Sequence, residues 1–479
     1  MGLAETLSFA LPELTLAVGA MVLLVVGVYL GERGARAIAL CCVALLIAAA
    51  LMTLVGKPGA ASLFDGAYRV DAFAHFAKVI IFVAAGVAIL MADRFLGADD
   101  LKRFEFPVLV VLSAFGMALM VSATDLIALY LGVETQSLAL YILATFNRDS
   151  RRSTEAGLKY FVLGALSSCL LLYGASLIYG FTGATTFSAI AEAAGAGDEN
   201  IGLIIGLVFL ISGLAFKVSA APFHMWTPDV YEGAPTPITA FFAAAPKLAA
   251  MALFSRVMVG AFPAVLDQWQ PIIVIISIVS MLIGAFSALV QTNIKRLMAY
   301  SSIGHMGYAL MGLAAGDREG VAAVLIYMAI YVVMNVGVFA CILMMRRRGG
   351  MSEGLGDLAG LSRTNMPLAL LLTLFMLSLA GIPPTAGFIG KWFVFFAAVD
   401  AGLITLAVVG ALSSVVSAYY YLKIVRLIWF TDPAPVFERD GGPALGFIAG
   451  LSGLAVFPAL FVFSGPLRGA AETAAQALF

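Results

Sequence analysis

Runs of about 20 apolar residues recur along the whole chain, and only short polar loops separate them. An α-helix of about 20 residues is long enough to cross the hydrocarbon core of a bilayer. The pattern therefore predicts an all-α integral membrane protein with about 14 transmembrane helices and no separate soluble domain. The predicted spans are residues 12–30, 36–55, 72–92, 106–122, 125–146, 154–180, 201–222, 236–260, 270–291, 297–314, 319–345, 366–398, 402–430 and 443–463.

Composition supports the membrane interpretation. Of 479 residues, 62% are hydrophobic and 11% are charged, and the mean hydropathy is +1.04. Because soluble domains carry about 25% charged residues, a water-soluble protein is excluded. The N-terminal stretch MGLAETLSFALPEL lacks the positively charged segment of a signal peptide, so we expect the first apolar run to be retained as a helix.

The sequence contains no motif for a bound cofactor. The four cysteines lie inside apolar runs without a CxxC pair, and the three histidines fall on three different segments. Neither a GxxxxGK[ST] motif nor a strand–GxGxxG–helix pattern occurs. Metal, haem, ATP and dinucleotide binding therefore lack support. We expect no redox cofactor, no metal and no nucleic-acid partner in this chain.

The placement of basic residues predicts the orientation in the membrane. Counted from an outside N-terminus, 17 Lys and Arg residues fall in inside loops and four fall outside. Cytoplasmic loops carry the excess of basic residues, so both termini are expected on the periplasmic side of a bacterial inner membrane. The inside residues are Arg33, Arg36, Arg94, Lys102, Arg103, Arg148, Arg151, Arg152, Lys295, Arg296, Arg346, Arg347, Arg348, Arg363, Lys423, Arg426 and Arg439, and the outside ones are Lys57, Arg69, Arg318 and Arg468.

The remaining six basic residues lie within predicted spans. Those within about two turns of a helix end can extend their side chains to the headgroups, and for Lys78 and Arg256 we favour that interpretation. Lys247 and Lys391 are too deep for it, and Lys217 is borderline. Glu134 is the single acid near the middle of a span, which suggests pairing with lysines across helices. The six basic residues are Lys78, Lys159, Lys217, Lys247, Arg256 and Lys391.

The stretch TDLIALYLGVETQSLALYILATF places Glu134 on one helical face with Tyr130 and Ser137. A carboxylate facing a lysine can stay ionised inside the membrane, whereas an isolated one becomes protonated. Ionisable residues inside a membrane usually mark a functional site. The alternative is an ion pair that only fixes helix packing.

Two predicted helices are interrupted by proline. In GLAFKVSAAPFHMW, Pro222 lacks an N–H group and its ring clashes with the preceding turn, close to Lys217. In SLAGIPPTAGFIGKWFVFF, a Gly-Ile-Pro-Pro stretch with Pro383 and Pro384 breaks a helix before Lys391. Irregular backbone at membrane depth is tolerated where it is buried or lines a hydrated cavity. Two interrupted helices in corresponding halves indicate inverted-repeat transport machinery.

Further candidates flank these breaks. Pro246 kinks the stretch APTPITAFFAAAPKLAAMALFSR immediately before Lys247. His305, in QTNIKRLMAYSSIGHMGY, is either a satisfied polar residue or a proton relay, since the pKa of histidine is near neutrality. Burial favours the neutral form of a lysine, and a nearby carboxylate favours the charged form. We therefore predict proton transfer along Glu134, Lys217, Lys247 and Lys391, with Lys159, His224 and His305 as supporting relays.

These motifs resemble the subunit N family of bacterial respiratory complex I (NADH-quinone oxidoreductase). They resemble more distantly its sister antiporter-like subunits and multisubunit cation/proton antiporters. The matching stretches, within residues 129–395, are LYLGVETQSLALY, GLKYFVLGALSS, FKVSAAPFHMWTPDVYEGAPTPITAFFAAAPKLAA, QTNIKRLMAYSSIGHMGYAL and LAGIPPTAGFIGKWFVF.

The resemblance implies two inverted five-helix repeats, 106–260 and 270–430, each with one discontinuous helix. Residues 1–105 then form three preceding helices, and 443–479 form helix 14 and a tail. By position, Glu134, Lys217, Lys247 and Lys391 match the family's helix-5 glutamate, broken-helix lysine, central lysine and second-half lysine. Lys159 matches a further family lysine, which weakens the headgroup interpretation there. The chain stops soon after helix 14, which favours subunit N over the type with a long lateral helix.

The resemblance also implies a function and partners. It implies translocation of one proton per turnover through this chain, coupled to quinone reduction elsewhere in the complex. FMN, iron–sulfur clusters and quinone are then expected in other subunits, and the partners are an antiporter-like neighbour, small membrane subunits and the lipid bilayer. The alternatives are a subunit of a cation/proton antiporter and a scaffold without pumping. A scaffold predicts that Lys217→Ala or Lys247→Ala leaves pumping intact.

Overall fold

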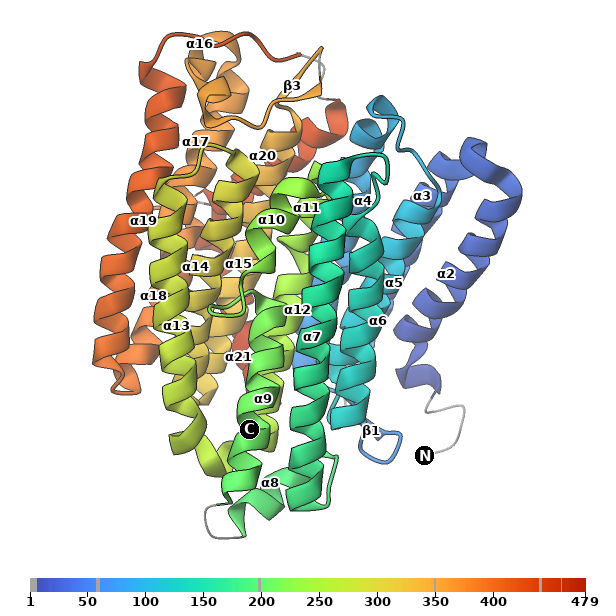
Figure 1. Cartoon of the computed structure of the whole chain (residues 1–479), viewed down its shortest axis with the longest axis vertical. Coiled ribbons are helices and arrows are strands. Elements are labelled where there is room, and N and C mark those ends of the chain that lie inside the picture. Colours follow the sequence, from blue (N-terminus) through green and yellow to red (C-terminus); the bar gives the residue numbers. More distant parts are fainter. Residues whose placement is uncertain (1–6, 57–60, 197–199, 349, 439–441, 458) are drawn as a thin grey trace.

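The computed structural model describes residues 7–56, 61–196, 200–348, 350–438, 442–457 and 459–479, with backbone alone for 459–464. Two of the basic residues used for the orientation, Lys57 and Arg439, lie outside the described residues. The described chain is a bundle of long helices with very little strand (Figure 1).

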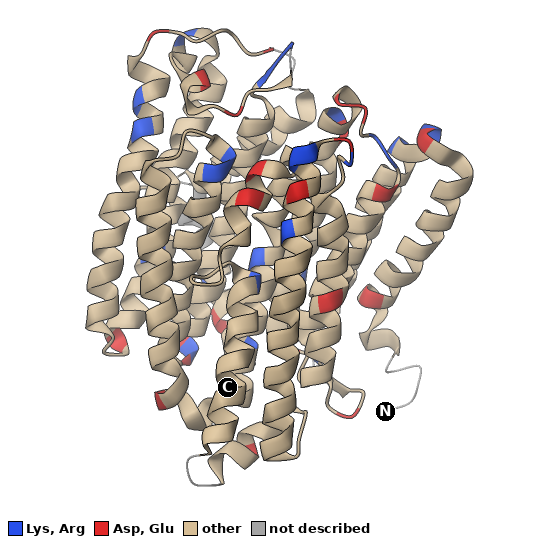
Figure 2. Cartoon of the chain, in the orientation of Figure 1, with Lys and Arg blue, Asp and Glu red and all other residues tan. Residues whose placement is uncertain are grey.

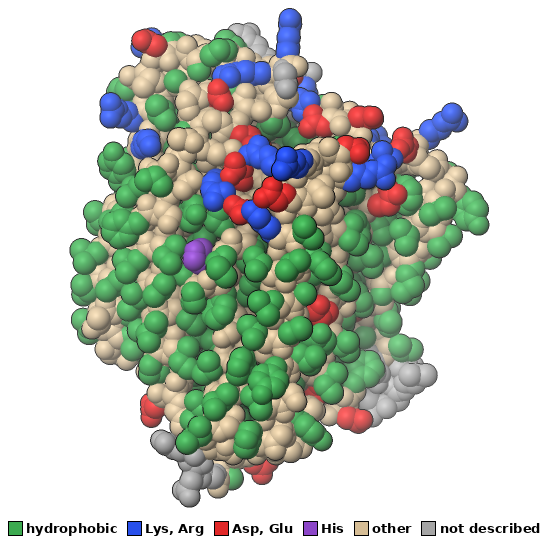
Figure 3. Space-filling view, in the orientation of Figure 1, with side chains coloured by type: hydrophobic (Ala, Val, Ile, Leu, Met, Phe, Trp, Pro, Cys, Tyr) green, Lys and Arg blue, Asp and Glu red, His purple; other side chains and the backbone are tan. Residues whose placement is uncertain are grey.

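Three long helices form the N-terminal part. They are α2 (Leu11–Leu30), α3 (Ala35–Val55) and α4 (Ala72–Ala98), with a short 3₁₀ turn, η1 (Gly31–Gly34), between the first two. A small antiparallel pair, β1 (Ala61–Leu63) and β2 (Tyr68–Val70), precedes α4 and pairs Ala61 with Val70. The helix α2 packs on α3 and α5 at the edge of the bundle, so much of its apolar side-chain surface is exposed (Figure 3).

The next part of the chain contains the first interrupted helix. Three long helices are followed by a short one, a helix in two pieces, and a second helix in two pieces. Their bounds are α5 (Glu105–Ser122), α6 (Leu126–Ala144), α7 (Arg151–Thr182), α8 (Phe187–Gly195), α9 (Ile201–Val218), α10 (Trp226–Gly233), α11 (Thr236–Phe242) and α12 (Ala245–Ala261).

The following part repeats this order: three long helices, a helix in two pieces, and a final long helix. After η2 (Pro263–Val265), the elements are α13 (Leu266–Leu289), α14 (Ile294–Ala314), α15 (Arg318–Leu343), β3 (Arg346–Arg347), β4 (Gly350–Met351), η3 (Leu355–Leu358), α16 (Leu361–Thr364), α17 (Met366–Ala380), α18 (Ala386–Asp400) and α19 (Ile404–Phe430). In both parts the first long helix packs on the second, and it also packs on the last: α5 on α6 and α12, α13 on α14 and α19.

The last part departs from the predicted span 443–463. The structure has two helices here, α20 (Pro443–Val456) and α21 (Ala459–Gln476), so the predicted tail is helical almost to its end. Both helices pack against α4 and α15. The C-terminal helices therefore lie beside α4, the last of the three N-terminal helices.

The other predicted spans each coincide with one helix or with a pair of consecutive helices. Among the described residues, ten helical segments are long and apolar enough to cross a membrane, with Leu11–Val55 counted as one segment although it holds α2 and α3. Polar residues mark where many of the helices begin. At six helix N-termini a side chain accepts a hydrogen bond from a backbone N–H group; these side chains belong to Asp71, Asp125, Ser150, Asn200, Asn293 and Asp317.

The helices α11 and α12 form the centre of the bundle, and their side chains are buried almost throughout. Apolar side chains cover the visible outer face of the bundle (Figure 3), as expected for helices that face lipid tails. Lys and Arg residues gather at one end of the bundle (Figure 2). We call this the basic end. It holds β3 (Figure 1), whose Arg346 lines one cavity with Arg94, and the start of α7, whose Arg152 lines another with Arg296.

Candidate functional site

The two interrupted helices that contain Pro222 and Pro384 break in the same way. The helix α9 ends at Val218, and the next residue, Ser219, has a left-handed backbone with φ of +62°. The helix α17 ends at Ala380, and Gly381 follows with φ of +82°. A left-handed residue at this position ends an α-helix. Each break also contains one cis X–Pro bond, before Pro222 and before Pro384.

A lysine ammonium binds the free end of each broken helix. The last carbonyl groups of an α-helix have no partner within the helix. Lys247, from α12, donates a hydrogen bond to the Val218 carbonyl at 3.0 Å and another to the Ser219 hydroxyl. Lys391, from α18, donates to the Ala380 carbonyl at 2.9 Å. Both lysines are buried. Each of the two deep lysines therefore binds the end of an interrupted helix, Lys247 from α12 and Lys391 from the second piece of that helix.

Pro246 positions the first of these lysines. The helix α11 ends at Phe242 and α12 begins at Ala245, so Pro246 stands in the first turn of a new helix. Proline fits there because the first N–H groups of a helix have no partner within it. The break lets Lys247 enter the centre of the bundle one residue after the proline.

The structure brings Glu134 and Lys217 together from α6 and α9. Their charged groups are 3.9 Å apart, and the Lys217 side chain is 6% exposed whereas that of Glu134 is 22% exposed. The Lys217 ammonium donates to Ser137 at 2.8 Å and to Ser168 at 3.4 Å. The Ser168 hydroxyl in turn donates to the Glu134 carboxylate. Ser168 thus bridges the acid and the lysine, whereas Ser137 accepts from the lysine and donates to the Val133 carbonyl.

Aromatic rings surround the central lysine. The Lys247 ammonium lies 5.3 Å from the ring centre of Trp226 and 6.0 Å from that of Tyr231. Trp226 stacks on Tyr160 with ring centres 4.3 Å apart. A ring face attracts a cation while it excludes water. The site can therefore hold a charged lysine in an otherwise apolar setting.

In the second half, His305 lies between two tyrosines. Its Nδ1 lies 2.6 Å from the Tyr327 hydroxyl, and its Nε2 lies 3.1 Å from the Tyr421 hydroxyl. The Tyr421 hydroxyl also contacts the Ser301 hydroxyl at 2.5 Å. A neutral imidazole has one donor and one acceptor, and a tyrosine hydroxyl can be either. Both tautomers of His305 are therefore satisfied, and a proton can leave by either nitrogen.

The surroundings of Lys391 are also hydroxyl-rich. Its ammonium donates to Ser414 on α19 at 2.8 Å and lies 4.9 Å from the ring centre of Tyr308. The Tyr308 hydroxyl is 3.1 Å from the Ser413 hydroxyl. Tyr308 is on the same helix as His305, one turn away, so the two polar groups of the second half share one helix face.

Two predicted relay residues lie elsewhere. Lys159 is on the outer side of α7, where its ammonium pairs with Asp229 at 2.8 Å and with Glu155 at 2.9 Å. His224 lies in the break between α9 and α10 and is partly exposed, and Pro222 is exposed. The structure groups Lys159 with the charges of the basic end rather than with Glu134.

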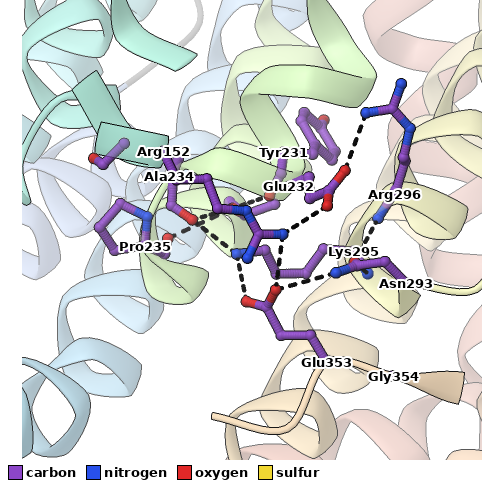
Figure 4. A network of polar contacts seen from close by, with 12 residues as sticks. Arg152, Tyr231, Glu232, Ala234, Pro235, Asn293, Lys295, Arg296, Glu353 and Gly354 are labelled. Atoms are coloured by element: carbon purple, nitrogen blue, oxygen red, sulfur yellow. Dashed lines mark hydrogen bonds and ion pairs between the residues drawn. The ribbon is translucent and has the colours of Figure 1, made fainter. Parts of the chain in front are cut away.

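A charged network that the sequence analysis did not predict lies at the basic end, between α7, α10, α14 and the segment after β4 (Figure 4). It contains four acids, Glu155, Asp229, Glu232 and Glu353, and four bases, Arg152, Lys159, Lys295 and Arg296. Arg296 bridges Asp229 at 2.7 Å and Glu232 at 3.0 Å. These two acids are three residues apart in TPDVYEG, so helical spacing was the signal that could have found them.

Glu353 joins the network from a distant part of the chain. Its carboxylate accepts from the Lys295 ammonium at 2.8 Å and from the Asn293 amide at 3.1 Å. Burial raises the pKa of this carboxyl, but Lys295, Asn293 and Arg152 outweigh that effect and hold the pKa below its usual value of 4.5. Lys295 was interpreted from sequence only as an inside loop charge, whereas here it is buried and also donates to the Ala234 carbonyl.

A cavity of about 180 Å³ opens among these charges. It is lined by Arg152, Glu155, Ala156, Lys159, Asp229, Glu232, Gly233 and Arg296. Its polar walls are wide enough apart to hold water. Water in this cavity can exchange protons with the carboxylates around it.

The headgroup interpretation of Lys78 and Arg256 is wrong. Lys78 is buried and its ammonium pairs with Glu13 on α2 at 2.7 Å. Arg256 is also buried, and both of its terminal nitrogens donate to Asp71, at 2.8 and 2.7 Å. The acids come from helix starts that are distant in sequence, so each basic residue has an internal partner and does not need to reach the headgroups.

Comparison with known proteins agrees with this geometry. The family described as "NADH:quinone oxidoreductase/Mrp antiporter, TM" matches residues 123–417. A relative from Rhizobium meliloti, named NADH-quinone oxidoreductase subunit N 1, is 56% identical over 100% of this chain and 99% of its own length. A chain in a structure of respiratory complex I from Thermus thermophilus with bound aureothin is 34% identical, with a TM-score of 0.82 over 96% of this chain and 98% of its own.

A chain in the Mrp complex from Dietzia has the same fold, with 25% identity and a TM-score of 0.85 over 98% of this chain and 97% of its own. The fold and the lysine-capped broken helices define the class of antiporter-like membrane subunits. Within that class, the sequence identity is decisive because it extends over the full length. The chain belongs to the subunit N family of NADH-quinone oxidoreductase.

Proposed function

We propose that this chain is a proton-translocating membrane-arm subunit of NADH:quinone oxidoreductase, and that Glu134, Lys217, Lys247 and Lys391 carry the protons. One observation supports the proposal above all: Lys217, next to the helix break, lies 3.9 Å from Glu134 and is bridged to it by the Ser168 hydroxyl. An ion pair held by exchangeable hydroxyls can open without leaving a charge entirely unsolvated. That property distinguishes a proton carrier from a fixed structural pair.

The helix breaks supply the second part of the mechanism. The free carbonyls at a helix C-terminus carry partial negative charge, which favours an ammonium over a neutral amine. The apolar surroundings favour the neutral amine. Lys247 and Lys391 are therefore set between two opposed effects, and a change in the charge on Lys217 or in local hydration can shift the balance. Pro222, Pro246, Pro383 and Pro384 act as the hinges that keep these carbonyls free.

We assign supporting roles to three further residues. Lys159, beside the 180 Å³ cavity, exchanges protons between water and the first half. His305, with tyrosine hydroxyls on both ring nitrogens, passes protons toward Lys391. His224 in the first break assists Lys217. We also propose that 106–260 and 270–430 are the two inverted repeats, with 1–105 and 443–479 flanking them.

The same proposal includes the setting of the chain. The basic end faces the cytoplasm of a bacterial cell, the protein spans the inner membrane, and both termini are periplasmic, since basic residues are retained on the cytoplasmic side. Its partners are an antiporter-like neighbour and small membrane subunits of the complex. FMN, iron–sulfur clusters and quinone belong to other subunits.

The test compares variants in the assembled complex in inverted membrane vesicles. Lys217→Ala and Glu134→Gln should reduce NADH-driven proton uptake strongly, measured with a pH-sensitive dye alongside NADH oxidation. Lys102→Ala removes a lysine of a partly exposed ion pair with Asp93 and serves as the control. Normal uptake in both site variants would support the scaffold alternative and overturn the proposal.

The likeness to a chain of the Mrp complex favours a second candidate, a subunit of a cation/proton antiporter. Exchange of Na⁺ would be expected to need more buried carboxylates than Glu134 near the middle of the spans. The antiporter proposal predicts that vesicles with this chain move protons in response to a Na⁺ gradient without NADH. The complex I proposal predicts no such response.

A further inference from the structure

We propose that a groove between α4, α15 and α20 binds an anionic phospholipid of the leaflet at the basic end. The groove has a volume of about 550 Å³, and its lining is almost entirely apolar. On α4 it extends from Val79 to Leu90, on α15 from Ala329 to Val336, and on α20 from Phe447 to Val456. Ala386 of α18 and Leu467 of α21 complete the lining, and none of Glu134, Lys217, Lys247 and Lys391 is among the lining residues.

The length of the groove matches one acyl chain. From Val79 to Leu90 the helix rises about 17 Å at 1.5 Å per residue. Half of a hydrocarbon core of about 30 Å is about 15 Å. The groove therefore covers the depth of a single leaflet and ends short of the other one. An acyl tail that entered from the basic end would fill it.

A small cleft with two arginines and one glutamate lies beyond the groove, at the ends of the same three helices, beside β3 and the segment after α19. It is lined by Arg94, Phe95, Leu343, Met344, Arg346, Glu438 and Leu445. Arg94 lies one turn beyond Leu90 on α4, Leu343 lies about two turns beyond Val336 on α15, and Leu445 is near the start of α20. The cleft is therefore at the headgroup level of the lipid whose tail lies in the groove.

The guanidinium of Arg346 has a vacant donor at this cleft. Its Nη2 binds the Asp99 carboxylate at 2.6 Å, whereas its buried Nη1 has no hydrogen-bond partner among the described residues. A buried charged donor without a partner is costly. A phosphate oxygen would satisfy it, because guanidinium and phosphate form strong charge-assisted hydrogen bonds. The neutral ring of a quinone offers no such charge, so the cleft favours a phospholipid.

The test measures lipid retention by the full chain purified in detergent. The protein is exposed to equimolar dioleoyl phosphatidylglycerol and phosphatidylethanolamine, and bound lipid is counted by native mass spectrometry. We expect several-fold selection of phosphatidylglycerol. Arg346→Gln should lower its retention about fivefold, since one basic residue near a membrane contributes about 1 kcal/mol. Arg363→Gln, an exposed arginine of the same end, is the matched control.

Two further variants separate the lipid from a structural role of Arg346. If Arg346 acted only by pairing with Asp99, then Asp99→Asn and Arg346→Gln would lower retention alike; the lipid site predicts that Asp99→Asn leaves it unchanged or raises it. Val83→Phe fills the exposed wall of the groove and should lower retention of both lipids, about fourfold for each methylene displaced. Leu131→Phe, exposed on α6, is its control.

Three results would overturn the proposal: equal retention of both lipids by the wild type, equal retention by Arg346→Gln and Arg363→Gln, or a quinone that V83F displaces in place of lipid. The measurement requires neither NADH oxidation nor proton uptake. Its failure is thus distinguishable from failure of the proposed function.

Discussion

The ammonium of Lys247 donates a hydrogen bond to the carbonyl of Val218, the last residue of α9, at 3.0 Å. Lys391 makes the corresponding contact with Ala380 at the end of α17. In both places a helix is interrupted inside the bundle and a lysine compensates the exposed carbonyl. Lys247 comes from α12, and Lys391 comes from the second piece of the same interrupted helix. The cation and the helix break are therefore one unit, because each would be unfavourable at this depth without the other.

This unit predicts the same loss of proton pumping for two chemically different substitutions of Lys247. Lys247→Met removes the proton carrier, whereas Lys247→Arg retains a cation and donors but cannot release a proton. We expect both to abolish NADH-driven proton uptake in vesicles. Lys102→Met, at a partly exposed ion pair, should leave uptake unchanged. Pumping by Lys247→Arg at the wild-type rate would show that this lysine does not need to lose its proton.

Gly381 allows a second test of the broken helix. Its φ is +82°, and a Cβ there would stand 2.8 Å from Cδ of Lys391. Gly381→Ala should cost about 1–2 kcal/mol in backbone energy and also displace the lysine. Gly402→Ala has a similar φ of +76° but open space around the new Cβ, so it isolates the backbone cost. We expect proton uptake to fall only in Gly381→Ala; a similar loss in both variants would assign the effect to general destabilisation.

The pair of Asp71 and Arg256 should dominate the stability of the N-terminal helices. Both side chains are buried, and removing one partner of such a pair costs about 3–5 kcal/mol. Asp71→Asn keeps a residue that can cap α4, so its cost reports the lost ion pair. Unfolding followed by circular dichroism in mixed detergent micelles should show a large decrease in the free energy of unfolding for Asp71→Asn and for Arg256→Gln. The free energy of unfolding of the double variant should fall by less than the sum of the two single-variant decreases.

Arg468→Gln is the matched control for that pair, because Arg468 and Glu472 form an exposed ion pair. Its cost should stay below about 1 kcal/mol. If breaking the buried pair and breaking the exposed pair lower the free energy of unfolding equally, burial does not determine how much Asp71 and Arg256 contribute to stability.

The lowered pKa of Glu353 predicts a pH-dependent contribution to stability. A carboxyl whose pKa is lowered in the folded state stabilises it fully above the ordinary value of 4.5, and this stabilisation is lost as the pH falls through the lower folded value. The difference in unfolding midpoint between wild type and Glu353→Gln should therefore be largest near neutral pH and shrink below pH 4.5. Glu192→Gln, exposed on α8, should show a small difference at every pH.

The errors of the sequence analysis have a common cause. Lys78 and Arg256 were placed near headgroups because depth along a helix was the only information available. Their acid partners, Glu13 and Asp71, stand at the starts of other helices and looked like ordinary end residues. Which helix faces which depends on side-chain packing over the whole bundle, and the apolar pattern of these helices is too uniform to indicate a buried face.

Apolar runs of spanning length, proline and glycine interruptions, and ionisable residues at membrane depth were all determined by the sequence. These features are local consequences of chain chemistry in lipid, so the spans and the four main proton-path candidates could be predicted from them. Only the tertiary structure decided that Lys247 binds the end of α9, that Glu353 reaches Lys295, and that Arg256 finds Asp71. Those contacts join residues that are tens to nearly two hundred positions apart, and only the packing of helices in three dimensions brings them within hydrogen-bond distance.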